Sequence, residues 1–152
     1  MSHEIDMSNG RANFAFTGSR DAVWHGLGSQ LTVGADLDTW RKEAGMDWIV
    51  KESDLLFNSM VGNALCPSLQ AFPDRKVLYR SDTGVPLSVM SKDYNIVQPA
   101  EVIEFFRDLT EKNGMVLSTA GCLFGGARFW ALAETGNECQ PIEGDTTKGY
   151  LL

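Results

Sequence analysis

An amphipathic helix, expected from about Pro99 to Asn113, constrains the fold of this chain more than any other segment. Proline suits the first turn of a helix, and Gly114 is placed to end it. Four apolar residues recur at helical spacing and form one stripe: Val102, Ile103, Phe106 and Leu109. Such a stripe must be buried against another layer. Because the neighbouring segments are rich in β-forming residues, the helix predicts a sheet that it covers.

Two hairpins are expected to supply this sheet. The first joins residues 76–81 to residues 85–91 through the short connection Asp82-Thr83-Gly84. The second joins residues 115–119 to residues 127–133 through a glycine-rich stretch. Both connections are short enough for neighbouring strands to pair antiparallel.

The remaining segments complete the expected fold. Residues 47–57 are expected to form a strand, and residues 58–74 a loop with at most one short strand, at residues 60–65. Asp36 can cap a short helix that ends near Gly45. Residues 134–148 are polar and acidic and are expected to form a loop. We therefore predict an α+β fold: an antiparallel sheet built from two hairpins, with one main covering helix and a short N-terminal helix.

The chain has 152 residues, the length of one ordinary domain. Residues 1–22 are expected to be an irregular N-terminal arm that Phe14 and Phe16 hold in place. Residues 23–152 are expected to form a single α+β domain, truncated at its C-terminal strand. The apolar end of that strand, Tyr150-Leu151-Leu152, is expected to pair with a sheet edge or with another copy of the chain, which would give a homo-oligomer.

Charge and hydropathy limit the classes of partner. The formal net charge is -7, which disfavours a general electrostatic grip on nucleic acid or on an anionic membrane. No apolar run approaches the roughly 18 residues of a membrane helix, and the N-terminus lacks a basic region followed by an apolar one. We therefore expect no membrane partner and a location in the cytoplasm.

No motif predicts catalysis or a cofactor. Three widely spaced cysteines and only two histidines argue against a disulfide framework and against a metal site. Serine-hydrolase, phosphate-loop and dinucleotide-binding fingerprints do not occur. We expect no catalytic residues, no cofactor and no metal, and therefore a protein that is not an enzyme.

Two groups of residues are candidates for binding. Trp24 and His25 could stack on a base or a small ligand, or they could form a structural turn with Gly26 and Gly28. Residues 75–92 hold four basic side chains against one acidic side chain, in contrast to the acidic chain as a whole. For Trp24 and His25 both interpretations, a ligand site and a structural turn, stay open.

Four residues are predicted to bind nucleic acid. Lys76 and Arg80 share one face of the first hairpin by their spacing, and Arg128 and Trp130 share one face of the second. A basic group beside an aromatic ring is typical of single-strand binding surfaces. The alternative is a solvated basic face together with a half-buried tryptophan.

An ordered series of motifs resembles the phage/plasmid-like protein family that carries domain of unknown function 932. The motifs are Trp24-His25-Gly26-Leu27-Gly28, Ala44-Gly45-x-Asp47-Trp48-x-Val50, Tyr94-x-x-x-Gln98-Pro99, Ala120-Gly121-x-Leu123-x-x-Gly126, Trp130-Ala131-Leu132 and Lys148-Gly149-Tyr150-Leu151-Leu152. The resemblance runs from about Ile5 to the last residue and suggests the N-terminal half of a family member. It implies a protein of phages and plasmids without an established activity. The order of elements is also loosely similar to the core of single-strand annealing recombination proteins.

Two functions follow as hypotheses. The first is a non-enzymatic mobile-element protein that binds single-stranded nucleic acid in replication or recombination. The alternative is an acidic protein-interaction module, such as a phage inhibitor of a host defence complex. The partner would then be a host or phage protein in the bacterial cytoplasm.

Overall fold

The computed structural model describes residues 4–20, 23, 26–60 and 66–152. Contacts divide the chain into two compact units. The first unit combines Met1–Trp48 with Gln98–Leu152, and the second unit is the continuous segment Ile49–Val97. Each unit has its own sheet, whereas the sequence predicts one sheet. The α+β class is confirmed.

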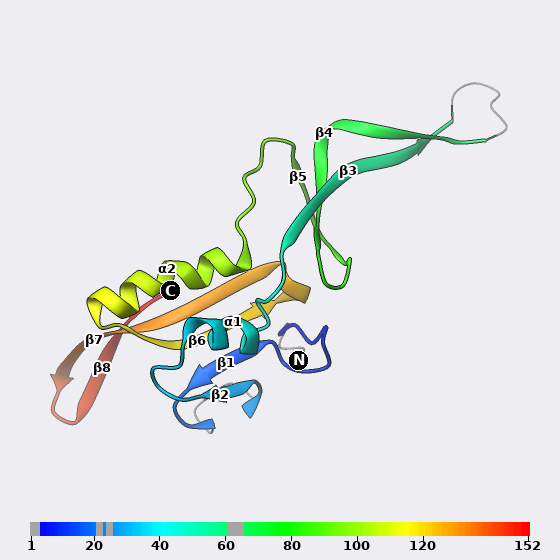
Figure 1. Ribbon diagram of the computed structural model, residues 1–152. Coiled ribbons are helices and arrows are strands. Elements are labelled where there is room, and N and C mark those ends of the chain that lie inside the picture. Colours follow the sequence, from blue (N-terminus) through cyan, green and yellow to red (C-terminus); the bar gives the residue numbers. More distant parts are fainter. Residues whose placement is uncertain (1–3, 21–22, 24–25, 61–65) are drawn as a thin grey trace. The chain divides into compact units, whose positions relative to one another are not determined.

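The sheet of the first unit has five strands in the order β2-β1-β6-β7-β8 (Figure 1). The strands are β1 (Phe14–Thr17), β2 (Ser29–Leu31), β6 (Val116–Leu123), β7 (Arg128–Ile142) and β8 (Asp145–Leu151), with a short 3-10 turn, η3 (Phe124–Gly126), before β7. β1 and β2 run parallel, and the other neighbours are antiparallel. Residues 1–22, expected to be an irregular arm, therefore contribute an inner strand, on which Phe14 and Phe16 are buried.

Helix α2 (Pro99–Asn113) lies along β6 and β7 (Figure 1). Its first turn is closed by the Glu101 carboxylate, which accepts a hydrogen bond from the Gln98 backbone N–H at 2.8 Å. Gly114 ends the helix in the left-handed conformation, with φ 65°. Ile103 and Phe106 face the sheet and are buried. The apolar stripe is therefore the face that covers the sheet.

Helix α1 (Leu37–Glu43) completes the core of the first unit. Asp36 caps the helix, because its carboxylate accepts a hydrogen bond from the Thr39 backbone N–H at 2.8 Å. Trp40 is almost fully buried and packs with Met46 and with residues of α2 and β6 in one cluster. The helix thus anchors the segment that precedes the second unit.

The second unit is a three-stranded antiparallel sheet in the order β3-β4-β5. Its strands are β3 (Val50–Ser59), β4 (Ser68–Arg80) and β5 (Pro86–Ser91). β3 and β4 extend together well beyond β5 (Figure 1). The far end of this pair is therefore a ribbon of only two strands.

Two segments expected to be loops contain strands. β4 begins at Ser68, inside the expected loop 58–74. β7 and β8 occupy most of residues 134–148, and Glu143-Gly144 forms the turn between them. The sequence gives little sign of these strands because a ribbon that solvent reaches on both faces needs no alternation of apolar and polar residues. β8 pairs with β7, so Tyr150 and Leu151 lie on a sheet edge.

Within the part of the chain that the structure describes, no helix has both the length and the apolar character needed to cross a membrane.

Candidate functional site

The far end of the β3–β4 pair is the most unusual surface of the second unit. We call residues 55–60 and 68–73 the distal ribbon. Residues 55–73 contain no Asp, Glu, Lys or Arg, although 22% of the residues of the whole chain are charged. Five large apolar side chains of the distal ribbon are substantially exposed: Leu56, Phe57, Met60, Leu69 and Phe72. This surface therefore has no charged side chain of its own to bind water strongly.

Both faces of the distal ribbon carry apolar side chains. Leu56 lies opposite Ala71, and Asn58 lies opposite Leu69, so that Leu56 and Leu69 share one face. Phe57 lies on the other face, where its ring meets the ring of Phe72 edge-on at 6.5 Å between centroids. A hairpin that covers a core has one apolar face. Here two faces are apolar and neither is buried.

The distal ribbon also has two open edges among the described residues. β5 pairs with β4 only from Arg75 to Tyr79, so residues 68–71 pair with β3 alone. β3 is the outermost strand of its sheet and pairs with β4 alone. Such edges present backbone N–H and C=O groups that can pair with a further strand.

The base of the distal ribbon is charged. A depression of about 340 Å³ lies there, lined by Glu52, Ser53, Asp54, Arg75, Lys76 and Lys92. The Lys76 ammonium donates to the Glu52 carboxylate at 2.8 Å across the two strands. Lys76, which the sequence predicts to bind phosphate, is therefore already engaged in an ion pair, and only 13% of its side chain is exposed.

Arg80 is buried rather than displayed. Its side chain is 2% exposed and makes a two-pronged contact with Asp82, with Nε to Oδ1 at 3.0 Å and Nη2 to Oδ2 at 2.7 Å. The hydrogen bond from Arg80 lowers the pKa of the Asp82 carboxyl. The geometry is that of a structural ion pair at the β4–β5 turn, where Asp82 also accepts from the Thr83 backbone N–H.

Arg128 and Trp130 belong to the first unit. The Arg128 guanidinium lies 5.0 Å from the centre of the Phe124 ring, and Arg128 and Phe124 are both exposed. Trp130 is half-buried, and its ring packs at 5.7 Å from the ring of Phe14. The four predicted residues thus fall on two different units, and only Arg128 is fully displayed.

The predicted Trp24 and His25 lie outside the described residues. Gly26 and Gly28 both adopt positive φ, 62° and 87°. A side chain at Gly28 would collide with the backbone and ring of Phe14. The backbone at Gly28 therefore packs closely on β1, and both interpretations of this segment stay predictions.

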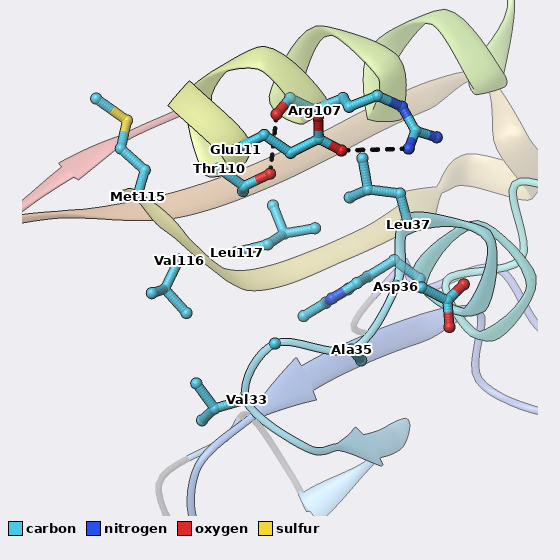
Figure 2. Close-up of a pocket in the computed structure, with 12 residues that line it drawn as sticks. Val33, Ala35, Asp36, Leu37, Arg107, Thr110, Glu111, Met115, Val116 and Leu117 are labelled. Carbon is cyan, nitrogen blue, oxygen red and sulfur yellow. Dashed lines mark hydrogen bonds and ion pairs between the residues drawn. The ribbon is translucent and has the colours of Figure 1, made fainter. Parts of the chain in front are cut away.

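A pocket of about 340 Å³ opens in the first unit between α1, α2 and the start of β6 (Figure 2). Its apolar lining includes Val33, Leu37, Trp40, Met115 and Leu117. At its rim Arg107 contacts Glu104 at 2.7 Å and Glu111 at 3.6 Å. The hydrogen bond between Arg107 and Glu104 raises the pKa of Arg107 and lowers the pKa of Glu104. These shifts move the pKa values of Arg107 and Glu104 away from neutral pH, so this pair offers fixed charge rather than acid-base chemistry.

Sequence reasoning missed the apolar side chains of the distal ribbon. The available signal was the uncharged stretch between Asp54 and Asp74. Because Pro67 and Pro73 stand in this stretch, a loop was the natural interpretation. Absence of charge, rather than a pattern of apolar residues, marks this surface.

Residues 86–152 match the family model described as Domain of unknown function (DUF932). The resemblance to this family is therefore confirmed over the C-terminal part of the chain. The motifs at residues 24–28 and 44–50 lie outside the match. No curated protein and no solved structure matches the chain.

Proposed function

We propose that this chain, similar to the DUF932 family over residues 86–152, is a non-enzymatic protein-interaction module that docks through the distal ribbon. One observation carries the proposal: a two-stranded ribbon exposes large apolar side chains on both faces. Contiguous exposed apolar patches of this kind mark interaction sites on folded proteins.

The energetics favour a partner on this surface. A two-stranded hairpin is at best marginally stable in water without a layer to pack on. Full burial of a Leu, Met or Phe side chain contributes about 1.5 to 3 kcal/mol. The five side chains are roughly half exposed, so a partner that covers them gains about 1 kcal/mol for each. A protein partner with an apolar surface can bury these side chains and gain this free energy. A nucleic acid presents a charged backbone and gains less.

The charge distribution favours a protein partner over nucleic acid. The distal ribbon has no cation to neutralise a phosphate, and Lys76 at its base is paired with Glu52. A chain of net charge -7 also repels a polyanion at long range. The setting implied by the family resemblance, a phage or plasmid protein in a bacterial cytoplasm, stays a prediction.

Site-specific photo-crosslinking tests the proposal. The photo-reactive amino acid p-benzoylphenylalanine is placed at Leu69, which is 65% exposed on the distal ribbon, or at the control position Ile142, which is 68% exposed on β7. Irradiation of expressing cells should give a defined protein adduct from position 69 and none from position 142. Equal adducts at both positions, or none at position 69, would overturn the proposal.

Single-stranded nucleic acid is the second candidate, favoured by the exposed Arg128 guanidinium against the exposed Phe124 ring. A cation beside an aromatic ring can contact a phosphate and stack on a base. Titration of labelled single-stranded DNA at low salt tests this binding, with Arg128→Ala compared with Lys112→Ala, a change at another exposed cation. Failure of the unsubstituted chain to bind would remove this candidate.

A further inference from the structure

We infer that the partner on the distal ribbon is a second copy of this chain, which pairs antiparallel with the outer edge of β3 around a two-fold axis at Leu56. The inference rests on the proposed function, because it names the partner of the same surface. The pairing would join two three-stranded sheets into one continuous sheet.

The strand itself is suited to edge pairing. Residues 56–59 of β3 pair regularly with residues 68–71 of β4. Between Asp54 and Leu56 the register shifts, because Lys76 faces Asp54 whereas Ala71 faces Leu56. The extra residues of this irregularity therefore lie on β4, and β3 continues through it as one strand. A partner strand along the outer edge of β3 meets an uninterrupted backbone.

Symmetry limits how β3 can pair with itself. Residues directly opposite each other in an antiparallel pair lie on the same face of the sheet. A two-fold axis that relates two antiparallel strands stands perpendicular to the sheet and keeps each residue on its face. Some residue at the centre must therefore face its own counterpart. The identity of that central residue defines the register.

Registers centred near the start of β3 bring like charges together. A centre at Glu52 or at Asp54 places that carboxylate opposite its own copy. A centre at Ser53 places Glu52 opposite Asp54 of the second copy. Like charges directly opposite each other destabilise a sheet. Residues 52–54 are therefore excluded as the centre of the antiparallel pair.

A centre at Leu56 gives a self-complementary register. Leu56 then faces its own copy, and Glu52 faces Met60 of the second copy. Asp54 faces Asn58 of the second copy, whose side-chain amide can donate to the carboxylate. A centre at Leu55 would instead place Asp54 opposite Leu56, where the carboxylate gains no donor. Position 56 alone gives Asp54 a hydrogen-bonding partner while it keeps like charges apart.

The net charge points to the same contact. Each copy carries a formal charge of -7, so two copies repel each other where their charged surfaces meet. The uncharged distal ribbon lets two copies approach without that repulsion. Pairing also changes the ribbon from two strands to four, which exceeds the three strands that a sheet with an apolar face needs for independent stability.

Two lysine substitutions on one face of β3 test the register. In Leu56→Lys two ammonium groups face each other at the two-fold axis, whereas in Asn58→Lys each ammonium faces Asp54 of the second copy. Both sites are exposed, so neither change disturbs the fold of the single chain. We expect sedimentation velocity to show a dimer of the unsubstituted chain, weakened at least about tenfold by Leu56→Lys and not weakened by Asn58→Lys.

Disulfide trapping checks the same axis. Leu56→Cys is compared with Leu69→Cys on the inner strand, with the exposed Cys66 and Cys139 changed to Ser in both. Residues opposite each other at the centre have Cβ atoms about 4.5 to 5.5 Å apart, close to disulfide range, so Leu56→Cys should form the disulfide dimer much faster. Faster trapping through Leu69→Cys would indicate stacking of faces and overturn the inference.

The same photo-reactive amino acid placed at Leu56, on the outer strand β3 that would meet the second copy, separates this inference from the proposed function. An adduct with twice the mass of the chain supports both. An adduct with another protein, together with a monomer in sedimentation, overturns the second copy as partner and leaves the interaction module standing. No adduct from position 56 or from position 69, together with a monomer in sedimentation, overturns both.

Discussion

Removal of the Asp82 carboxylate tests whether Arg80 has a structural role. Asp82→Ala deletes two hydrogen bonds to a guanidinium whose side chain is 2% exposed. A hydrogen bond to a charged group contributes about 1.5 to 3 kcal/mol. Loss of the Asp82 carboxylate also leaves the buried Arg80 charge without this partner and poorly solvated. Asp82 itself is 40% exposed, so water screens part of the interaction. We expect a loss of about 2 kcal/mol in the free energy of unfolding of the second unit.

The dependence on pH gives the prediction a second signature. In the folded chain the pKa of Asp82 is lowered, chiefly by the hydrogen bond from Arg80. A carboxyl with a lowered folded-state pKa adds stability that is fully present above its unfolded pKa, about 3.9. That stability is lost as pH falls through the folded-state value. The difference between the unsubstituted chain and Asp82→Ala should therefore be largest near neutral pH and shrink on acidification.

Urea unfolding followed by far-ultraviolet circular dichroism measures the effect, and hydrogen exchange of residues 49–97 assigns it to the second unit. Asp74→Ala is the matched control, since it removes an exposed carboxylate from β4 of the same unit and should change stability by less than about 0.5 kcal/mol. Equal effects of the two substitutions, or a difference that does not depend on pH, would refute the structural role. For the same reason Arg80→Ala is a poor test of nucleic-acid binding, because it should destabilise the unit that carries it.

Three further predictions concern the first unit. Gly121→Ala should destabilise it by about 1 to 3 kcal/mol in thermal unfolding, because a Cβ at this position would collide with the Trp130 ring. Trp40→Ala should cost about 3 to 5 kcal/mol in urea unfolding, because it removes the largest fully buried side chain among the described residues. Glu101→Ala should cost about 1 kcal/mol by the loss of the reciprocal cap with Gln98, and hydrogen exchange in the first turn of α2 should increase.

Helix α2 could be predicted from the sequence because its signals are local. Pro99, Glu101 and Gly114 act on the turns in which they stand, and the apolar stripe is repeated within the helix itself. Sequence reasoning fixes such an element with little knowledge of its surroundings.

The position of β1 and the length of β4 could not be predicted in this way. β1 pairs with β6, which lies about a hundred residues further along the chain, and only three of its four residues take part. β4 passes through Pro73 at the irregularity in its pairing with β3. Long-range pairing and bulges leave weak traces in the local sequence.

The face of Arg80 could have been inferred. Leu78 stands between Lys76 and Arg80 at the spacing of one strand face, and it is buried. An apolar residue between two basic residues indicates a face turned toward a core as readily as a solvated one. The local excess of basic residues favours the interpretation as a solvated face, whereas the buried Leu78 between Lys76 and Arg80 favours a face turned toward a core.

The order in which the two units appear along the chain has a consequence for synthesis on the ribosome. The second unit is one continuous segment, whereas the first unit is completed only when the residues after Gln98 emerge. β1 in particular has no antiparallel neighbour until β6 is made. Since domains generally fold as units in the order of their synthesis, the β3–β4–β5 sheet can form while α2 and β6–β8 are still absent. The uncharged hairpin is then displayed on nascent chains, and neighbouring ribosomes on one messenger hold such chains close together.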